Sequence, residues 1–426
     1  MLTTPRNDGR LEPPDGTFSS YILGRRREPL RLQIRVMDSP VFRQLTARIL
    51  PSIAAIDRRA WDRIFGAASE GFDYYLACEN APPSMFEFSA VGVLDGETLV
   101  AGAPAFRTNF RLDMMLEGRS RNLADWVGRR FPRLINIAVM GAGSPHSDDL
   151  SLAIDPALNA PQRKLALEML LDGLERQAAL SGIGMTFLKN VSDRDSHWSH
   201  EVLQRRGYAR VAALPIATLS VPNSDEAYIA SLSANMRSNI RRKMKRAKQL
   251  RVEVRGSVEG VEEEIFALRE ATRRRAMTNY DVFAEVSTSY FRHVLSHLGE
   301  RAKLLLYWRG DALIGFALVL IEPGRLIEKY TGMRYPDGPV HGVFFMNWMT
   351  QVRLCVERGI PELRAGETTY LTKARLGCKL HRSWIYFRHH RRPVNGLFGL
   401  LSRWIAFDST DPDLRKLGTE APYVEP

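Results

Sequence analysis

Glu367 and Lys373 place a carboxylate and an amine close together in the segment RAGETTYLTKARLG at 364–377. Glu367 follows a predicted strand, and Lys373 lies on a predicted short helix. A carboxylate at the end of a strand beside a cleft can act as a general base, and a nearby ammonium can stabilise negative charge. The same segment also fits a capped surface helix, so the residue types suggest proton transfer here without requiring it.

A second segment, YTGMRYPDGPVHGVFF at 330–345, has the composition of a phosphate-binding loop. A predicted strand ends near Thr331, and a predicted helix begins near Val343. Backbone amides in such a loop and at a helix N-terminus can bind phosphate. Arg334, Gly338 and Gly342 would form this cradle, although glycine spacing alone also fits an ordinary loop.

The most basic segment is SLSANMRSNIRRKMKRAKQ at 231–249, which predicts one helix. Met236, Ile240, Met244 and Ala247 recur at helical spacing and form an apolar stripe. The rest of the helix carries arginines and lysines with no acidic residue among them, so like charges repel across its turns. Either the glutamates at 262–264 offset these charges, or an anionic ligand does.

Other polar side chains could line a substrate cleft. The loop GAGSPHSDDL at 141–150 contains His146 and Asp149, but no second cluster with ligand spacing accompanies them, so no metal site is predicted. Glu328 and Tyr330 alternate on one predicted strand face, which points either into the cleft or into the core. Both His146 and Tyr330 are therefore candidate site residues.

The composition fits a globular protein with anionic partners. The chain has 426 residues, which suggests two domains, and a net charge of +12. Its three cysteines are far apart and odd in number, so no disulfide framework is predicted and a reducing compartment is expected. Cys378 precedes His381 by a short turn but lacks an orienting partner, so a packing role is expected for this thiol.

No segment resembles a secretion signal or a membrane-spanning helix. The first residues, MLTTPRNDGRLEPPDG, have no apolar core, and the apolar stretch 304–321 is interrupted by a turn at Gly310 and Asp311. A cytoplasmic protein is expected. The segment 395–407 has an apolar helical face beside arginines, so weak association with a membrane surface is one alternative and core packing is the other.

The predicted elements occur in a similar order in both halves of the chain. The first half has a helix at 57–68, a hairpin at 86–106, a strand at 134–140, a helix at 161–180, a strand at 185–189, a helix at 197–206 and a strand at 211–221. The second half has helices at 262–276 and 289–298, a hairpin at 304–319, a strand at 325–331, a helix at 343–357, a strand at 362–365, a helix at 370–376 and a strand at 384–389.

This order, and a weak alignment of the two hairpins, predict two similar α/β lobes, each with a mixed, mostly antiparallel sheet flanked by helices. The predicted division has four parts. They are an N-terminal tail at 1–30, a first lobe at 31–215, a second lobe at 216–392, and a C-terminal amphipathic helix and tail at 393–426.

Two segments resemble a known family. The stretch SANMRSNIRRKMKRAKQLRVEV resembles the FemAB-like, BioF2-like branch of the GNAT acyltransferase superfamily, in which a short helix, a basic helix and a strand open a lobe. The stretch from Met346 to Ser383 resembles the C-terminal pattern of that branch, with Trp348, Gly366 and Lys373 in matching places. The resemblance covers about 45–390 and implies tandem GNAT-like lobes that transfer an acyl or aminoacyl group to an amine.

The resemblance implies a role for each site residue. Glu367 would be the base or substrate anchor, Tyr330 a proton donor and Lys373 a charge stabiliser, while the loop from Arg334 to Gly342 would hold the phosphates of the carrier. Residues expected to contact the substrate or an anionic carrier are Arg237, Arg241, His146 and Asp149.

The nature of the donor remains open from the sequence. The glycines of the 334–342 loop are more widely spaced than in the usual GNAT pyrophosphate loop, and no long coiled-coil insertion is present. The expected donor is acyl-CoA or acyl carrier protein, used as a co-substrate without a tightly bound cofactor. The acceptor is an amine of a small molecule or a precursor of the cell envelope or a polysaccharide. The alternatives are transfer from aminoacyl-tRNA and a non-catalytic module that binds polyanions.

Overall fold

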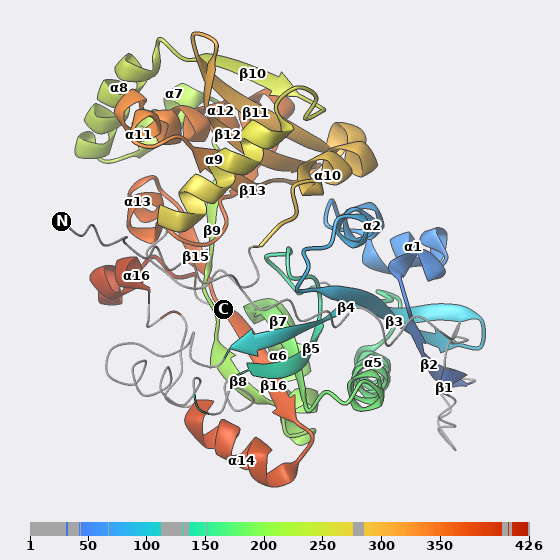
Figure 1. Cartoon of the computed structure of the whole chain (residues 1–426). Helices are drawn as coiled ribbons and strands as arrows, with labels where there is room; N and C mark the ends of the chain where they lie inside the picture. Colours follow the sequence, from blue (N-terminus) through green and yellow to red (C-terminus); the bar gives the residue numbers. More distant parts are fainter. Residues whose placement is uncertain are drawn as a thin grey trace, which may run out of the picture.

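The computed structural model describes residues 31–32, 42, 44–66, 68–111, 130, 136–150, 152–275, 285–402, 408 and 411–424, and the statements below concern this part of the chain. Two twisted sheets, each flanked by helices, form two lobes (Figure 1). The predicted fold class, two α/β lobes with mostly antiparallel sheets, is therefore confirmed.

The sheet of the first lobe has the strand order β1-β2-β3-β4-β5-β7-β16-β8, with β6 paired to β4. Only the β5–β7 pair is parallel in this described sheet. The hairpin predicted at 86–106 is present and joins β3 to β4, with its turn at Asp95 and Gly96. The strands are β1 (Arg31–Leu32), β2 (Leu45–Leu50), β3 (Glu87–Asp95), β4 (Thr98–Arg111), β5 (Asn136–Ala142), β6 (Ala153–Ile154), β7 (Met185–Ser192), β8 (Ala209–Ala212) and β16 (Ser383–His389).

Helix α5 covers this sheet because its inward face is almost entirely apolar. Its N-terminus is fixed by a capping box between Asn159 and Gln162, and it ends before Gly182, which has a positive φ. The other helices of this lobe are short. The helices are α1 (Arg58–Phe65), α2 (Phe72–Asn80), α5 (Ala160–Leu180), α6 (Asp193–Arg205) and α14 (Arg392–Leu401), with a 3-10 turn η1 (Ile53–Ala55).

The sheet of the second lobe has the order β10-β11-β12-β13-β14-β9-β15. Within it, β13 and β14 are parallel, and the other pairs are antiparallel. The strands are β9 (Ile216–Ser220), β10 (Arg251–Arg255), β11 (Ala302–Arg309), β12 (Ala312–Glu322), β13 (Arg325–Met333), β14 (Glu362–Arg364) and β15 (Lys379–His381).

Helices cover both faces of this second sheet, which explains the continuous apolar run of β12. Phe316 and Leu318 pack in the core under α9 and α10, whereas Ala317 and Val319 pack in the core under α8 and α12. Side chains alternate along a strand, so a strand buried on both faces must be apolar throughout. The helices are α7 (Asp225–Ser231), α8 (Ala234–Ala247), α9 (Glu262–Arg275), α10 (Tyr290–Leu298), α11 (Asp337–His341), α12 (Val343–Arg358), α13 (Tyr370–Arg375) and α16 (Pro412–Leu417), with 3-10 turns η3 (Gly299–Arg301) and η5 (Gly418–Glu420).

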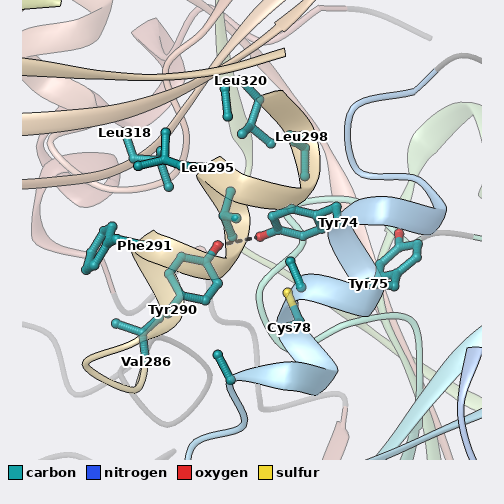
Figure 2. Close-up of a cluster of buried hydrophobic side chains, with 14 of the residues drawn as sticks. Tyr74, Tyr75, Cys78, Val286, Tyr290, Phe291, Leu295, Leu298, Leu318 and Leu320 are labelled. Atoms are coloured by element: carbon teal, nitrogen blue, oxygen red, sulfur yellow. Dashed lines mark hydrogen bonds between the residues drawn. The ribbon is translucent and has the colours of Figure 1, made fainter. Parts of the chain in front are cut away.

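The two lobes share one hydrophobic core. Trp61 and Tyr74 of the first lobe belong to the same buried cluster as Tyr290 and Phe291 of α10. Figure 2 shows α2 facing α10, with the hydroxyl groups of Tyr74 and Tyr290 2.8 Å apart. The lobes are therefore packed against each other through a continuous buried cluster.

Strand pairing differs from the predicted division in two places. The predicted strand 211–221 is two strands, because Pro215 interrupts it, with β8 in the first sheet and β9 in the second. Strand β16, which the sequence division places in the second lobe, pairs with β7 and β8 of the first sheet. The sheet to which a strand belongs depends on contacts with segments far away in the chain. The residue pattern within the strand carries no information about these contacts.

Two helices also differ from expectation. The segment 231–249 is not one helix throughout, because α7 ends at Ser231 and Ser233 caps a new helix, α8, at Ala234. Helix α2 was not predicted, since it has no side-chain cap and is buried around much of its circumference. The helical face predicted within 395–407 lies partly outside the described residues.

Candidate active site

The parallel strands β13 and β14 diverge at the centre of the second sheet. They pair only at their first residues, from Arg325 with Glu362 to Ile327 with Arg364. Strand β13 then continues along β12, whereas the chain after Arg364 turns toward β9. There the amide of Ala365 donates a hydrogen bond to the carbonyl of Ala217 at 2.9 Å. Residues on either side of this divergence can therefore surround a bound group.

A β-bulge at Lys329 changes the direction of three successive side chains at this point. Tyr330 pairs with Leu318 and Glu328 with Val319, so Lys329 is the extra residue of the bulge. Glu328 faces α12, where its carboxylate accepts from Asn347 at 2.7 Å and from Gln351. Lys329 reaches the first lobe, and Tyr330 faces α9 and α10.

Glu367 lies just beyond the divergence, on the turn after β14. Its carboxylate accepts a hydrogen bond from Asn190 of β7 at 3.0 Å, so a residue of the first lobe orients it. Burial raises the pKa of Glu367 to about 7, because the opposing attraction of Lys189, Lys329 and Lys373 is smaller. A half-buried carboxylate with this pKa can accept a proton near neutral pH.

The turn that carries Glu367 has an uncommon backbone conformation. Thr368 and Thr369 have φ angles of 73° and 51°, in the left-handed region that non-glycine residues rarely adopt. Such residues cost about 1–3 kcal/mol each and require surrounding contacts to hold them. The Nζ of Lys373 provides such contacts, since it donates to the carbonyls of Gly366 at 3.3 Å and Glu367 at 3.0 Å.

Lys373 is buried, and burial lowers its pKa despite nearby acidic groups. The structure thus brings Glu367 and Lys373 together as the sequence suggested, but the amine contacts backbone carbonyls of the turn. Its position stabilises the conformation of the segment that presents Glu367.

Tyr330 and His146, predicted separately from the two lobes, are in contact. The Tyr330 hydroxyl lies 3.2 Å from the Nδ1 of His146. Burial lowers the pKa of His146 to about 3, with Lys189 and Lys329 adding to the effect, so this imidazole is neutral at physiological pH. Burial also raises the pKa of Tyr330, so its hydroxyl keeps its proton. At neutral pH Tyr330 is therefore uncharged, and its hydroxyl can donate a hydrogen bond.

A buried cluster of ion pairs joins the lobes beside these residues. Lys329, whose side chain is 1% exposed, contacts Glu70 at 2.5 Å and Asp148 at 3.4 Å. Burial alone would lower the pKa of Lys329 and raise that of Asp148, but their mutual attraction outweighs it and shifts each pKa toward the charged form. Arg364 pairs with Asp149 at 2.5 Å. Asp149, predicted to contact substrate, thus has its carboxylate engaged by Arg364.

Lys189 forms hydrogen bonds to the 141–150 loop and holds it next to this cluster. Its ammonium donates to the carbonyl of Pro145 at 3.1 Å and to that of Ser147 at 2.8 Å. These contacts fix His146, which lies between the two carbonyls in the chain. No local sequence pattern predicted a site role for Lys189, Asn190, Lys329, Glu70 or Arg364. One signal was available: Glu328 and Lys329 are adjacent charges within an otherwise apolar strand.

Only some of the backbone amides in the predicted phosphate-binding loop are free to bind a phosphate. The amides of Gly338 and Gly342 donate to backbone carbonyls, to Arg334 at 2.7 Å and to Pro339 at 3.3 Å. Gly342 adopts a φ of 76° and begins α12 without a side-chain cap, so the first-turn amides of α12 remain for an anion. Arg334 is exposed and donates to the carbonyl of Leu313 at 3.1 Å.

Helix α8 packs through its apolar stripe and exposes its cations. Met236, Ile240 and Ala247 are buried, as predicted. Arg237 donates to the carbonyls of Ala230 and Leu232, whereas Arg241 is exposed. Within the described residues, no cation of α8 forms an ion pair with a carboxylate, and Glu262 instead pairs with Arg292. The glutamates at 262–264 therefore do not neutralise this helix through ion pairs.

A cavity of about 290 Å³ lies between the lobes next to the buried cluster. Polar residues of both lobes line it, among them Arg163 and Asp195 from the first and Arg325 from the second. The guanidinium of Arg163 lies 4.8 Å from the centre of the Trp198 ring. The cavity also touches Glu70 and Arg364, so it adjoins the ion pairs described above.

Metal and thiol chemistry receive no structural support in the described part of the chain. No group of three or more His, Cys, Asp or Glu residues that could hold a metal ion occurs there. Cys78, Cys355 and Cys378 are buried and free, and burial raises the pKa of Cys378 to about 12. His381 lies next to Thr218, at 2.9 Å from its hydroxyl. None of the described helices is long and apolar enough to cross a membrane.

Part of the chain matches a known protein family. Residues 234–370, which contain α8, the β13–β14 divergence and Glu367, match the family described as acetyltransferase (GNAT) domain. No curated protein matches the chain. The crystal structure of FemX is 12% identical, with a TM-score of 0.51 over 82% of this chain and 98% of FemX.

A tandem GNAT protein from the clavulanic acid biosynthesis pathway is 12% identical, with a TM-score of 0.47 over 80% of this chain and 98% of that protein. At such identities the comparison with FemX concerns the fold. The chain thus has a two-lobed fold similar to that of FemX, and residues 234–370 of its second lobe match a GNAT domain.

Proposed function

We propose that the protein is an N-acyltransferase that moves an acyl group from a phosphorylated carrier to an amine by direct attack. The observation that carries this proposal is Glu367, a half-buried carboxylate with a pKa of about 7 at the divergence of β13 and β14. An attacking amine must lose a proton, and a carboxylate of this pKa can accept it near neutral pH.

In the proposed reaction, the amine nitrogen attacks the carbonyl carbon of a thioester. The new C–N bond forms while Glu367 takes a proton from nitrogen, and the C–S bond then breaks. The thiolate that leaves takes a proton from the Tyr330 hydroxyl. The proton that Glu367 gained then returns to Tyr330 through solvent, so that amine and thioester give amide and thiol. Lys373 holds the turn that carries Glu367. The first turn of α12 and Arg334 would bind the carrier phosphates.

The cavity between the lobes supports a small acceptor. It is bounded by arginines and carboxylates from both lobes and adjoins the Lys329–Glu70 and Arg364–Asp149 pairs. An acceptor with an amine and an acidic group would find partners for both in such a lining. His146 stays neutral, and its Nδ1 lies 3.2 Å from the Tyr330 hydroxyl.

An aminoacyl-tRNA donor is the second candidate. The ester of an aminoacyl-tRNA would undergo the same attack, with an alkoxide leaving in place of a thiolate. The observation in its favour is α8, whose exposed cations could contact a phosphate backbone. The same helix could serve a non-catalytic module that binds polyanions.

A donor and acceptor screen tests the proposed function. The full chain is incubated with acetyl-CoA or longer acyl-CoAs and with amino acids or amino sugars, and free thiol is measured against time. We expect thiol release that depends on the amine and yields the amide. No amide from any donor, combined with salt-sensitive binding of polyanions, would instead support the non-catalytic module.

Replacing Tyr330 by Phe removes the proposed proton donor while keeping the aromatic packing. We expect kcat to fall about 100-fold, with little change in KM for either substrate, because the hydroxyl acts on the leaving group. Steady-state kinetics of thiol release measure this effect. Tyr208→Phe is a matched control, since this buried tyrosine of the first lobe donates to Glu175 of α5 at 3.0 Å, away from the divergence. Equal losses in both variants would contradict a catalytic role for Tyr330.

A further inference from the structure

We infer that the exposed face of α8, together with Val340 of α11, is a docking surface for a small acidic protein that carries the acyl group on a phosphopantetheine arm. This inference rests on the proposed function, because it names the donor of that same reaction. It distinguishes a protein-borne thioester from free acyl-CoA.

The first support is the charge of α8. Its cations are not neutralised by ion pairs with any described carboxylate, in contrast to α9, where Glu262 pairs with Arg292 and Glu270 with Arg273. Like charges on successive turns repel by about 0.2–0.5 kcal/mol per pair. An acidic partner would relieve this repulsion, so charge complementarity selects an anionic surface.

The second support is the direction of the cations. At 100° per residue, Arg242, Lys245 and Arg246 lie on the side of the helix opposite Ile240, which is buried. These three residues are exposed. They therefore form one outward row, directed away from the core and available to a partner.

The third support is the position of α8 against the donor loop. A Cβ built on Gly342 would lie 3.1 Å from the carbonyl oxygen of Lys243, so the backbone of α8 touches the start of α12. Gln249, just after the helix, contacts His341. Figure 1 shows α8 and α11 side by side, on the part of the second lobe farthest from the first. A carrier protein bound to α8 would thus place the phosphate of its phosphopantetheine arm at the 334–342 loop.

A protein fits this surface better than a nucleic acid. The helix sequence ANMRSNIRRKMKRA contains no aromatic residue on which a base could stack. Val340 is 54% exposed on α11, which contacts α8, and an apolar side chain within a basic surface suits a protein interface. With 14 residues at about 1.5 Å each, α8 is about 21 Å long, which matches one helix of a small partner.

The test compares two donors and two charge-reversal variants. The first variant is Arg242→Glu/Lys245→Glu/Arg246→Glu. The control, Arg59→Glu/Arg194→Glu/Arg309→Glu, makes the same change in net charge at exposed arginines on other elements. For each protein, kcat/KM is measured with acyl-CoA and with the same acyl group on a bacterial acyl carrier protein, at several salt concentrations. Binding of the carrier protein is measured by calorimetry.

We expect the α8 variant to lose about tenfold or more in kcat/KM with the carrier protein, along with most of its salt dependence, because surface charges mainly steer association. The loss with acyl-CoA should be much smaller, and the control should behave as the parent does. Equal losses with both donors, or none with the carrier, would overturn the docking surface while leaving the acyltransferase function intact. Tight tRNA binding that depends on α8, without carrier binding, would also overturn it. Failure of the parent with every donor would instead contradict the proposed function.

Discussion

Replacing Glu367 by Gln is expected to lower kcat about 10²- to 10⁴-fold, the range typical for loss of a general base. Glutamine keeps the size of the side chain and can still accept the hydrogen bond from Asn190, so the turn should retain its conformation. The substitution removes the ability to accept a proton, together with the negative charge that attracts Lys189. Steady-state thiol release with saturating donor and acceptor measures the effect.

The pH profile gives a second signature of the same residue. The pKa of Glu367 is raised to about 7, so this carboxylate is increasingly protonated, and unable to accept a proton, as pH falls below that value. The parent rate should therefore decline by about tenfold per pH unit on the acid side and level off above neutrality. The Glu367→Gln variant should lack this decline.

Glu362→Gln is a matched control for the Glu367 experiment. Glu362 lies on β14, close in sequence, but its carboxylate pairs with Arg325 at 3.2 Å and is 38% exposed. It should keep the parent rate and pH profile. A Glu367→Gln variant with parental turnover would exclude this residue as the base, and the proton acceptor would then have to be sought elsewhere.

Replacing Lys329 by Met is expected to destabilise the protein by about 3–5 kcal/mol, because it leaves buried carboxylates without their partner. The side chain of Lys329 is 1% exposed and that of Glu70 is 8% exposed, so water cannot readily replace the lost contacts. Denaturant unfolding followed by tryptophan fluorescence measures the loss. Adding Glu70→Gln to this variant should restore part of the stability, since one unpaired charge is removed.

Arg353→Ala provides the comparison for this prediction. Arg353 contacts Asp225 at 2.9 Å, but its side chain is 48% exposed. Such surface pairs contribute about 0–1 kcal/mol. If Lys329→Met were no more destabilising than Arg353→Ala, the buried cluster would not be a main connection between the lobes.

The elements that the sequence predicted well are those with local signals. The β3–β4 hairpin follows from the turn residues Asp95 and Gly96, and α5 follows from its helical pattern and from Gly182, near which it stops. The sequence division placed β16 in the second lobe, whereas this strand pairs with β7 of the first sheet, where Ser383 lies opposite Ser192, 191 residues away in the chain. No local pattern records such a contact.

The site residues also divide into those with a local sequence signal and those whose position depends on contacts between distant segments. Glu367 and Tyr330 were predicted from strand ends and alternation, and His146 from a polar loop, but their placement together depends on the shared core. Lys329 was missed because a bulge cannot be read from residue alternation, and Asn190 because it acts from the other lobe. Their catalytic roles remain predictions that the variants above test.

The core shared by the lobes has a consequence for how such a protein can change. Trp61 and Tyr74 are buried against α10, and β16 returns to the first sheet after the GNAT domain is complete. Recombination that exchanged one lobe for that of a relative would expose this aromatic surface and leave β16 without its partners. The two halves must therefore be inherited and diversified as a unit, and a new acceptor specificity would arise through substitutions rather than through exchange of a lobe.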